Sequence, residues 1–252
     1  MSPQPMRVIV TGAASGFGAA IAQKMAASGA QVLVADLNAQ GAAAMAQGLR
    51  DQGWQAQHCA VNIAQAVDVA RMVESAMQAW GGIDVLVNNA GTTHKNKPAM
   101  EVTEEEFDRI FQVNVKGLFF TTQKVLPIMV QQKSGCVVNV ASTTGVRPGP
   151  GLTWYSATKA AMINATKGLA LEMAPHGVRV NAVNPMIGET PMMTDFMGME
   201  DTPANRERFL QRIPLRRFTR PQDVANSVYY LASTDAAYLT GVCLDVDGGR
   251  NI

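Results

Sequence analysis

Short apolar segments alternate with longer segments of helical periodicity along most of the chain. The apolar segments are rich in β-branched residues and are bounded by Gly, Asn or Asp, which is typical of strands. Their hydrophobicity is continuous rather than alternating, as expected for strands that are covered on both faces. The predicted strands are Arg7–Thr11, Gln31–Asp36, Gln55–Ala60, Val85–Asn88, Gly135–Val140, Val178–Asn184 and Val242–Val246.

Helical periodicity fills most of the intervals between these strands. Thr103-Glu104-Glu105-Glu106 predicts a capping box that opens a long helix to about Gln132, with a kink or shift expected at Pro127. The regular alternation predicts an α/β fold, a doubly wound parallel sheet with right-handed crossovers. No linker or repeat divides the chain, so we expect one domain over residues 1–252. The other predicted helices are Phe17–Ser28, Ala39–Gln52, Ala66–Trp80, Tyr155–Ala174 and Pro221–Ser233.

The stretch Pro185–Arg220 departs from this rhythm. It holds five methionines, several Pro and Gly, and six arginines after Asn205. We expect an insertion of loop and short helix near residues 186–218. A simple surface excursion would explain it, but adaptable methionines favour a mobile lid with a substrate-facing apolar surface.

Composition and charge exclude several functional classes. The formal net charge is +1 without a long basic run, which predicts no nucleic-acid partner. No apolar stretch approaches the roughly 20 residues of a membrane-spanning helix, and Met1–Met6 lacks the pattern of a signal peptide. Three separated cysteines suit free thiols in a reducing compartment, and three scattered histidines disfavour a metal site. We therefore expect a cytoplasmic protein without a metal or a membrane partner.

A glycine-rich turn joins the first predicted strand to the first predicted helix. Its sequence is Thr11-Gly12-Ala13-Ala14-Ser15-Gly16-Phe17-Gly18. Free backbone N–H groups and the positive end of a helix dipole make such a turn a binding site for a pyrophosphate. The first βα junction is the expected place for it in a doubly wound fold.

Asp36 ends the second predicted strand and is followed by Leu37. A carboxylate there can accept hydrogen bonds from ribose hydroxyls and would repel a 2′-phosphate. No Lys or Arg stands ready to hold that phosphate, so the sequence predicts NAD in preference to NADP.

Further motifs follow in a fixed order. They are Asn88-Asn89-Ala90-Gly91, Asn114, Ser142, Tyr155-Ser156-Ala157-Thr158-Lys159, Asn184-Pro185 with Thr190, and Asp245-Val246-Asp247-Gly248-Gly249. With the glycine turn, whose spacing is Thr-Gly-x-x-x-Gly-x-Gly, they make the chain resemble the short-chain dehydrogenase/reductase family over nearly its whole length. The resemblance implies a single-domain Rossmann fold and hydride transfer between a nicotinamide coenzyme and an alcohol or ketone.

The resemblance also implies which residues contact the coenzyme. Two positions depart from the usual family pattern: Asn62-Ile63 replaces Asp and an aliphatic residue beside the adenine, and Met186 replaces Gly after Pro185. The predicted coenzyme contacts are Gly12, Ser15, Gly16, Phe17, Gly18, Asp36, Leu37, Asn62, Ile63, Asn88, Ala90, Gly91, Tyr155, Lys159, Pro185, Gly188 and Thr190.

Tyr155 and Lys159 are four residues apart and therefore share one face of a helix. A nearby ammonium favours the phenolate, so Tyr155 can act as acid in reduction and as base in oxidation. Ser142 follows a strand, where its hydroxyl can stabilise the substrate oxygen. By resemblance, Lys159 also binds the nicotinamide ribose, and Asn114 holds a water that passes protons to Lys159.

The expected substrate pocket mixes apolar and small polar side chains. Arg147 is the nearby charge of interest: it would pair with an anionic group of the substrate or lie solvated in its loop. The predicted pocket residues are His94, Thr144, Arg147, Trp154, Met186, Met192, Met193 and Phe196, with Thr93, Thr143 and Ile187 as further candidates.

The leading function is interconversion of a small secondary alcohol and its ketone. A 3-oxoacyl thioester reductase and a sugar or polyol dehydrogenase share the same motifs, and a nucleotide-sensing module without turnover is a remote alternative. Arg206, Arg208, Arg212, Arg216 and Arg217 offer either a solvated face or a patch for an acyl-carrier protein. Small residues on the helix after Tyr155 permit a partner helix to pack closely, and the resemblance to the family implies a homotetramer; the sequence does not separate a dimer from a tetramer.

Overall fold

Seven parallel strands form one twisted sheet in the computed structural model, which describes residues 5–252. The strand order is β3-β2-β1-β4-β5-β6-β7, so the chain reverses direction across the sheet between β1 and β4. This confirms the predicted doubly wound fold, and each strand begins and ends within one residue of its predicted bounds. The strands are β1 (Arg7–Thr11), β2 (Gln31–Asp36), β3 (Ala56–Ala60), β4 (Val85–Asn88), β5 (Gly135–Val140), β6 (Val178–Pro185) and β7 (Cys243–Val246).

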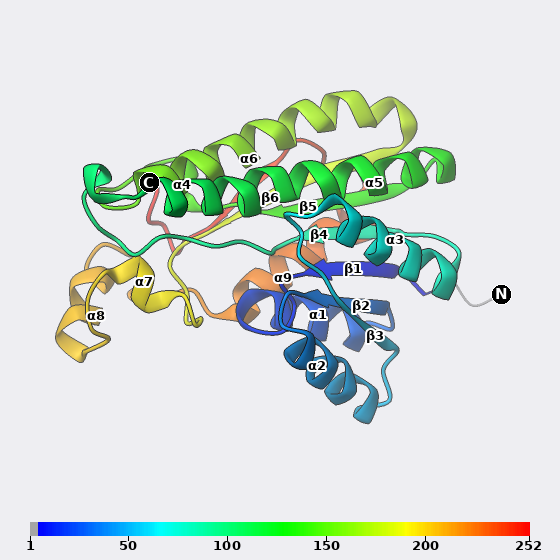
Figure 1. Ribbon diagram of the computed structural model, residues 1–252, viewed down its shortest axis with the longest axis horizontal. Helices are drawn as coiled ribbons and strands as arrows, with labels where there is room; N and C mark the ends of the chain where they lie inside the picture. Colours follow the sequence, from blue (N-terminus) through cyan, green and yellow to red (C-terminus); the bar gives the residue numbers. More distant parts are fainter. Residues whose placement is uncertain (1–4) are drawn as a thin grey trace.

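Helices cover both faces of the sheet (Figure 1). Successive side chains of a strand point to opposite faces, so Val8 and Val10 pack in one hydrophobic cluster and Ile9 packs in the other. The first cluster includes residues of α1 (Gly16–Ala27), α2 (Ala39–Asp51) and α9 (Pro221–Ala232). The second includes residues of α3 (Ala66–Trp80), α5 (Gly117–Gln132) and α6 (Thr153–Met173). Because both faces are buried, the strands carry the continuous apolar runs seen in the sequence.

The predicted long helix after Thr103 is not continuous. It consists of α4 (Glu104–Phe111), a π-helical turn η2 (Gln112–Lys116) and α5. The predicted capping box is present, because Thr103 Oγ1 accepts from Glu106 N–H and the Glu106 carboxylate accepts from Thr103 N–H. Pro127 lies inside α5 without ending it. The interruption falls at Asn114, which places this side chain in the π-helical turn.

The segment between β6 and α9 forms an insertion of loops and two short helices, α7 (Met193–Met197) and α8 (Pro203–Leu210). Figure 1 shows them beyond the end of the sheet where the carboxyl ends of the strands meet. Met193, Met197, Ile213 and Phe218 form a small hydrophobic cluster inside the insertion. The predicted insertion is therefore confirmed, while its mobility stays a prediction.

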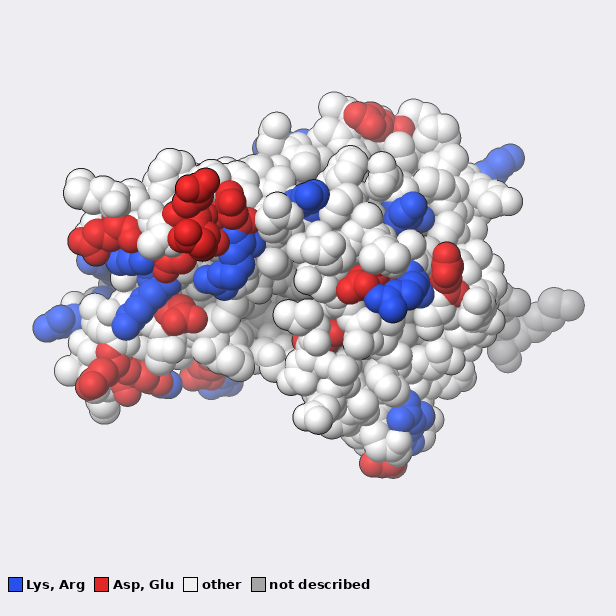
Figure 2. Space-filling model, viewed as in Figure 1, with Lys and Arg blue, Asp and Glu red and all other residues white. Residues whose placement is uncertain are grey.

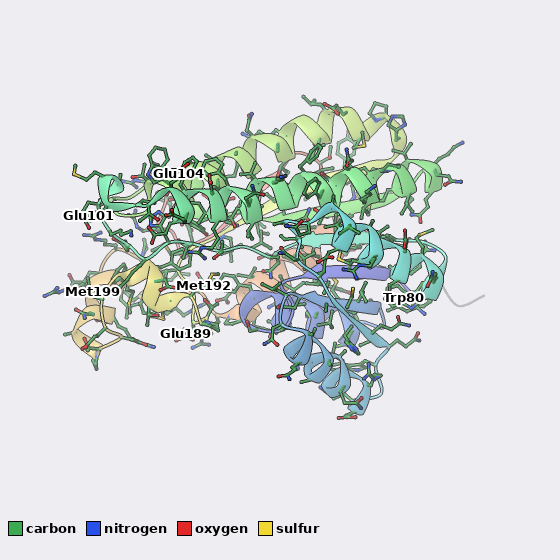
Figure 3. All side chains as sticks on the ribbon, viewed as in Figure 1. Trp80, Glu101, Glu104, Glu189, Met192 and Met199 are labelled. Atoms are coloured by element: carbon green, nitrogen blue, oxygen red, sulfur yellow. The ribbon has the colours of Figure 1, made fainter. Side chains whose placement is uncertain are left out.

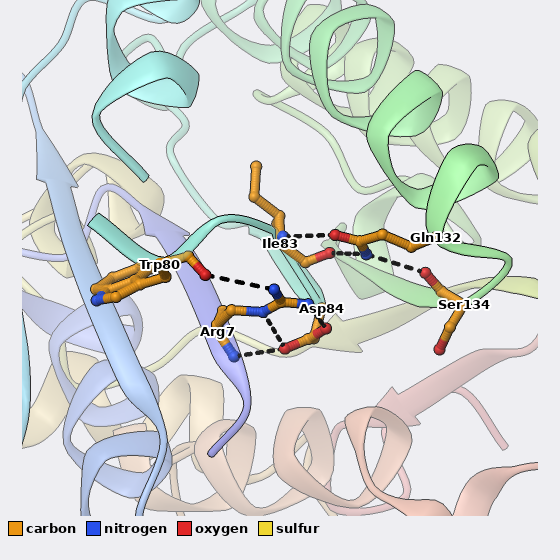
Figure 4. Close-up of polar contacts among 6 residues, drawn as sticks. All are labelled: Arg7, Trp80, Ile83, Asp84, Gln132 and Ser134. Carbon is orange, nitrogen blue, oxygen red and sulfur yellow. Dashed lines mark hydrogen bonds and ion pairs between the residues drawn. The ribbon is translucent and has the colours of Figure 1, made fainter. Parts of the chain in front are cut away.

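The opposite end of the sheet is fastened by a polar cluster (Figure 4). The Arg7 guanidinium makes two hydrogen bonds to the Asp84 carboxylate, at 2.8 and 2.6 Å, and the Arg7 N–H makes a third at 2.8 Å. The Gln132 amide bonds to both the N–H and the carbonyl of Ile83. These contacts hold β1 and the start of β4 to the end of α5, far from the carboxyl edge.

The remaining short helices are η1 (Ala99–Glu101), η3 (Thr143–Gly145), η4 (Ala174–His176) and η5 (Thr234–Ala236). None of the helices within residues 5–252 combines the length and the hydropathy needed to cross a bilayer. The expected domain covers residues 1–252, of which the first four lie outside the described residues, as does most of the Met1–Met6 segment.

Candidate active site

A cavity of about 1040 Å³ lies at the carboxyl edge of the sheet. Gly12, Asp36, Asn89, Ala141 and Pro185, at the ends of five different strands, contribute to its wall. In Figure 2 the surface is hollowed between the part built from α7 and α8 and the part built from α1 and α2. Ligands of open α/β sheets bind at this edge, beside the point where the strand order reverses.

The glycine turn brings uncapped backbone N–H groups to this cavity. Ser15, the residue before α1, makes no side-chain capping bond, and the first turn of α1 holds no acidic residue. Gly12 has a φ of +64°, and a Cβ there would lie 2.7 Å from Ala90 Cα. A Cβ at Gly18 would lie 2.0 Å from the Gly12 carbonyl oxygen. The turn is thus a close-packed cradle with free donors, and it fits the pyrophosphate of a nicotinamide dinucleotide.

Asn89 and Thr11 hold the cradle in place. Asn89 Nδ2 donates to the carbonyls of Thr11 and Gly12, each at 2.9 Å. Thr11 Oγ1 accepts from the N–H groups of Asn89 and Ala90. These bonds join the end of β1 to the end of β4 across the position where the strand order reverses. Sequence analysis missed this role of Asn89, although it stands inside the Asn88–Gly91 motif.

Asp36 lies on the cavity wall at the end of β2 and is fixed by two backbone donors. Its carboxylate accepts from Ala14 N–H and from Asn38 N–H, each at 2.9 Å. Leu37 is 73% exposed on the rim. Asn62 and Ile63 also contribute to the wall, and the Asn62 amide oxygen accepts from Ala64 N–H.

Of the seventeen predicted coenzyme contacts, two do not contribute to the cavity wall, Gly18 and Asn88. Gly18 instead packs against Gly12, so its role is to let α1 approach the turn. Asn88 points into the protein, where it donates to Asn139 Oδ1 and accepts from Thr121 Oγ1. The other fifteen lie on the wall of the cavity.

Tyr155 and Lys159 face the cavity from α6, and both are almost completely buried. The Lys159 Nζ lies 5.8 Å from the centre of the Tyr155 ring and donates to the Val140 carbonyl at 2.8 Å. Burial lowers the pKa of Lys159 from 10.5 to about 8. Burial also raises the pKa of Tyr155 above its usual value, and the Ser142 hydroxyl opposes that rise. A positive charge beside the phenol is therefore needed before Tyr155 can lose its proton near neutral pH.

Ser142 follows β5 and caps the short helix η3. Its Oγ accepts from Thr144 N–H at 3.2 Å and lies 3.0 Å from Thr144 Oγ1. These contacts fix the hydroxyl at the cavity wall, on the same side as Tyr155. A substrate oxygen held by both hydroxyl groups would have a proton donor and a second hydrogen bond.

Asn114 does not reach the cavity. Its Oδ1 accepts from Thr92 N–H, and its Nδ2 donates to the Thr92 carbonyl and to Thr158 Oγ1. Both amide hydrogens are thus used within the protein. The side chain joins the loop after β4 to α6 at Thr158, the residue directly before Lys159.

The insertion supplies much of the apolar wall. Met186, Met192 and Phe196 contribute to it, and the Phe196 ring packs edge-on against Tyr155 with 5.1 Å between centroids. Figure 3 shows Met192 and Met199 at the two ends of α7, below α4. Among the predicted pocket residues, Thr144, Arg147, Met186, Met192 and Phe196 lie on the wall, as do the further candidates Thr143 and Ile187.

Three predicted pocket residues lie elsewhere. Trp154 turns toward α4, where its ring meets Phe107 edge-on and its Nε1 donates to the Ala99 carbonyl. Met193 is buried in the hydrophobic cluster of the insertion. His94 is buried with its Nδ1 donating to the Lys95 carbonyl. The further candidate Thr93 is likewise buried and donates to the carbonyl of His94.

Asn96 is a wall residue that sequence analysis missed. Its Nδ2 donates to the Phe196 carbonyl at 3.0 Å, and its N–H donates to the Asp195 carbonyl at 2.8 Å. It packs against Gly151 and Gly198, where a Cβ would come within 1.9 and 2.8 Å of Asn96 atoms. Asn96 thus ties α7 to the loop after β4 and holds Phe196 over Tyr155.

Comparison with known proteins gives a consistent result. Residues 12–251 match the family described as enoyl-(acyl carrier protein) reductase. The 4-formylbenzenesulfonate dehydrogenase TsaC1/TsaC2 of Comamonas testosteroni is 66% identical over 244 residues, which are 97% of each chain. The 3-oxoacyl-[acyl-carrier-protein] reductase FabG of Thermotoga maritima is 39% identical over 96% of each chain. This chain belongs to the short-chain dehydrogenase/reductase family.

Solved structures of the short-chain dehydrogenase/reductase family superpose closely on this chain. A 3-ketoacyl-(acyl-carrier-protein) reductase from Brucella melitensis in complex with NADH has a TM-score of 0.91 and 42% identity, over 97% of this chain and 98% of that chain. Levodione reductase has a TM-score of 0.93 and 31% identity, over 98% and 99%. The chain is therefore an oxidoreductase that acts on CH–OH or C=O groups with a nicotinamide coenzyme.

Proposed function

We propose that this chain is an NAD-dependent dehydrogenase in which Tyr155 is the general acid and base. The observation that carries the proposal is the buried arrangement of Tyr155, Lys159 and Ser142 on one wall of the cavity at the carboxyl edge of the sheet. Fifteen of the seventeen predicted coenzyme contacts contribute to the wall of the same cavity.

The protein's part of the chemistry is a proton transfer. The coenzyme, when bound, accepts or supplies the hydride. In oxidation, the Tyr155 phenolate takes the proton of the alcohol hydroxyl as the carbonyl forms. In reduction, the Tyr155 hydroxyl gives that proton to the carbonyl oxygen. Lys159, in its charged form, lowers the energy of the phenolate, and Ser142 Oγ donates to the substrate oxygen.

We propose NAD as the coenzyme because Asp36 presents its carboxylate where the adenosine ribose would lie. Two backbone N–H groups hold this carboxylate in place, so it cannot swing away from a 2′-phosphate. Leu37 contributes no positive charge to balance such a phosphate. The NADH complex of the Brucella melitensis relative is consistent with this preference.

The substrate we propose is an alcohol–carbonyl pair attached to an aromatic ring. The name of the Comamonas testosteroni relative points to this class, because it specifies a formyl group on a benzene ring. The wall beside Tyr155 suits such a ring, since Met186, Met192 and Phe196 offer adaptable apolar contacts. Small secondary alcohols would use the same catalytic residues.

Reduction of 3-oxoacyl thioesters is a second candidate, because several relatives at 37–39% identity are named 3-oxoacyl-[acyl-carrier-protein] reductases. The predicted arginine patch for an acyl-carrier protein is divided in the structure. Arg206 pairs with Asp201, and Arg217 pairs with Asp223. Arg208 and Arg212 contribute to the cavity wall instead. This division favours the aromatic substrate.

A substrate panel tests the proposal. Purified protein with NAD or NADP is assayed on benzyl alcohols and benzaldehydes, secondary alcohols, polyols and 3-oxoacyl thioesters, by absorbance of the reduced nicotinamide. We expect turnover of the aromatic compounds with NAD and none in a Tyr155→Phe variant. Preference for acyl-carrier thioesters would establish the second candidate, and coenzyme binding without turnover on any substrate would reject both.

We also propose a homotetramer in the cytoplasm. Ala157, Ala160 and Ala161 lie exposed on α6, where they permit a partner helix to approach closely, and Leu171 of α6 and Phe119 of α5 are 80% and 55% exposed. Light scattering that shows a monomer at assay concentration would refute the assembly.

A further inference from the structure

The wall of the cavity carries an excess of positive charge that the chain as a whole lacks. Six basic side chains contribute to it, while Asp36 is the sole acidic residue among the wall residues of the described chain. The net charge of the protein is only +1. On the outer face shown in Figure 2, acids and bases are instead mixed over α4, α7 and α8. The basic residues of the wall are Arg109, Arg147, Lys159, Arg208, Arg212 and Arg250.

Two of these six groups are already used by the protein. Lys159 donates to the Val140 carbonyl. The Arg109 guanidinium donates to Thr92 Oγ1 and to the Thr93 carbonyl. By contrast, the guanidinium groups of the other four, Arg147, Arg208, Arg212 and Arg250, form no ion pair or hydrogen bond within residues 5–252.

The arginines in and just after α8 are of two kinds, one held in ion pairs and the others at the cavity wall without a partner. Arg206 is not among the wall residues; it pairs with Asp201 and lies near Glu189. Arg208, Phe209 and, one turn further on, Arg212 contribute to the wall. The acidic residues of the insertion thus neutralise Arg206 and leave Arg208 and Arg212, which are exposed at the cavity wall, without a counter-ion.

Arg147 belongs to a different segment of the chain from Arg208 and Arg212. It lies in the loop between Ser142 and Tyr155, and its neighbours Gly149, Pro150 and Leu152 share the same wall. Its loop therefore connects two catalytic residues directly, whereas Arg208 and Arg212 belong to the insertion. An anion that bound all three arginines would bridge these two parts of the protein.

We propose that Arg147, Arg208 and Arg212 form an anion subsite that recognises an acid group, sulfonate or carboxylate, carried by the aromatic substrate at a distance from the reacting carbon. This inference rests on the proposed function for the identity of the substrate. The apolar side chains of Met192, Phe196 and Phe209 contact the ring, and guanidinium groups bind planar or tetrahedral oxyanions with paired N–H donors. The subsite explains why the wall needs positive charge beyond what a coenzyme pyrophosphate requires.

The test compares matched substrates on matched variants. The substrates are 4-formylbenzenesulfonate and 4-formylbenzoate, each against uncharged 4-methylbenzaldehyde, and the variants are R147M, R208M, R212M and the triple variant. R206M serves as control, because Arg206 lies on the same helix but outside the wall. We expect the anionic-to-neutral ratio of kcat/KM to fall by about tenfold or more in the triple variant and to stay unchanged in R206M. Added salt lowers this ratio in the wild type and leaves it unchanged in the triple variant.

A binding measurement separates this inference from the proposed function. Calorimetry of benzenesulfonate with the NAD complex reports on the anion subsite whether or not the enzyme turns over an aldehyde. Benzenesulfonate affinity that survives in the triple variant would overturn the subsite. An equal loss of kcat/KM for charged and neutral substrates, with weaker NAD binding, would also overturn it, because the arginines would then serve the coenzyme phosphates. Loss of benzenesulfonate binding in the triple variant, at unchanged NAD affinity, would support it even if every aldehyde proved inert.

Discussion

Replacing Lys159 by methionine is expected to stabilise the coenzyme-free protein at neutral pH while it ends catalysis. The ammonium group is almost completely buried, makes one hydrogen bond to Val140 and has no carboxylate partner within the described residues. Burial lowers its pKa from 10.5 to about 8. That difference corresponds to about 3 kcal/mol against the charged form in the folded state.

The sign of the pH dependence follows from where the proton binds. Between the folded pKa of about 8 and the ordinary value of 10.5, the unfolded chain holds the Lys159 proton and the folded chain does not. The contribution of Lys159 to stability therefore rises with pH across this interval. Methionine removes the charge but also the bond to Val140, which costs about 1 kcal/mol. We expect Lys159→Met to gain about 2 kcal/mol near pH 7 and to lose about 1 kcal/mol near pH 10.5.

Urea unfolding at the two pH values, at one protein concentration and without coenzyme, measures this difference. Lys167→Met is the control for removal of a lysine charge, because Lys167 lies exposed on the same helix. The reasoning would be refuted if the difference between wild type and Lys159→Met were the same at both pH values.

Three further changes probe the site. Tyr155→Phe should lower kcat by at least 10²–10⁴-fold and leave the Kd for NADH unchanged; a parallel loss of NADH binding in fluorescence titrations would assign the residue to the coenzyme instead. Asp36→Ala combined with Leu37→Arg should shift the ratio of kcat/KM toward NADP, and an unaltered ratio would contradict the assigned role of Asp36. Asn96→Ala removes the bond that holds Phe196 and should raise KM for the alcohol by roughly fivefold at constant NAD affinity; an unchanged KM would show that Asn96 does not position Phe196.

The fold could be predicted in detail because strands buried on both faces have an unmistakable pattern. The runs around Ile9, Leu33 and Leu86 are apolar at every position, since alternate side chains enter opposite hydrophobic clusters. The π-helical turn at Gln112–Lys116 was not predictable in this way. Residues 112–116 contain neither Gly nor Pro, so no helix-interrupting residue marks the position of this turn in the sequence.

Ser142, Tyr155 and Lys159 could be expected at the carboxyl edge of the sheet because each stands at a fixed place in a motif, and the structure places all three on the cavity wall, whereas Asn114 lies behind it. The neighbours of these residues could not be predicted, because the direction of a side chain depends on its position around the helix and on contacts with residues distant in sequence. Trp154 precedes Tyr155 by one position, which turns it by about 100° away from the cavity and onto α4. Asn96 donates a hydrogen bond to Phe196, which is one hundred residues away in the sequence. No local sequence pattern predicts such a contact.

The insertion between β6 and α9 has a consequence for how this protein can change over time. The residues proposed to transfer the proton lie at the sheet edge and on α6, while much of the apolar cavity wall belongs to α7, α8 and their loops. Mutations can therefore accumulate in the insertion, altering which compounds are accepted, without disturbing the acid–base apparatus or the dinucleotide cradle. Proteins built in this way can change their substrate specificity during evolution and keep the same catalytic mechanism.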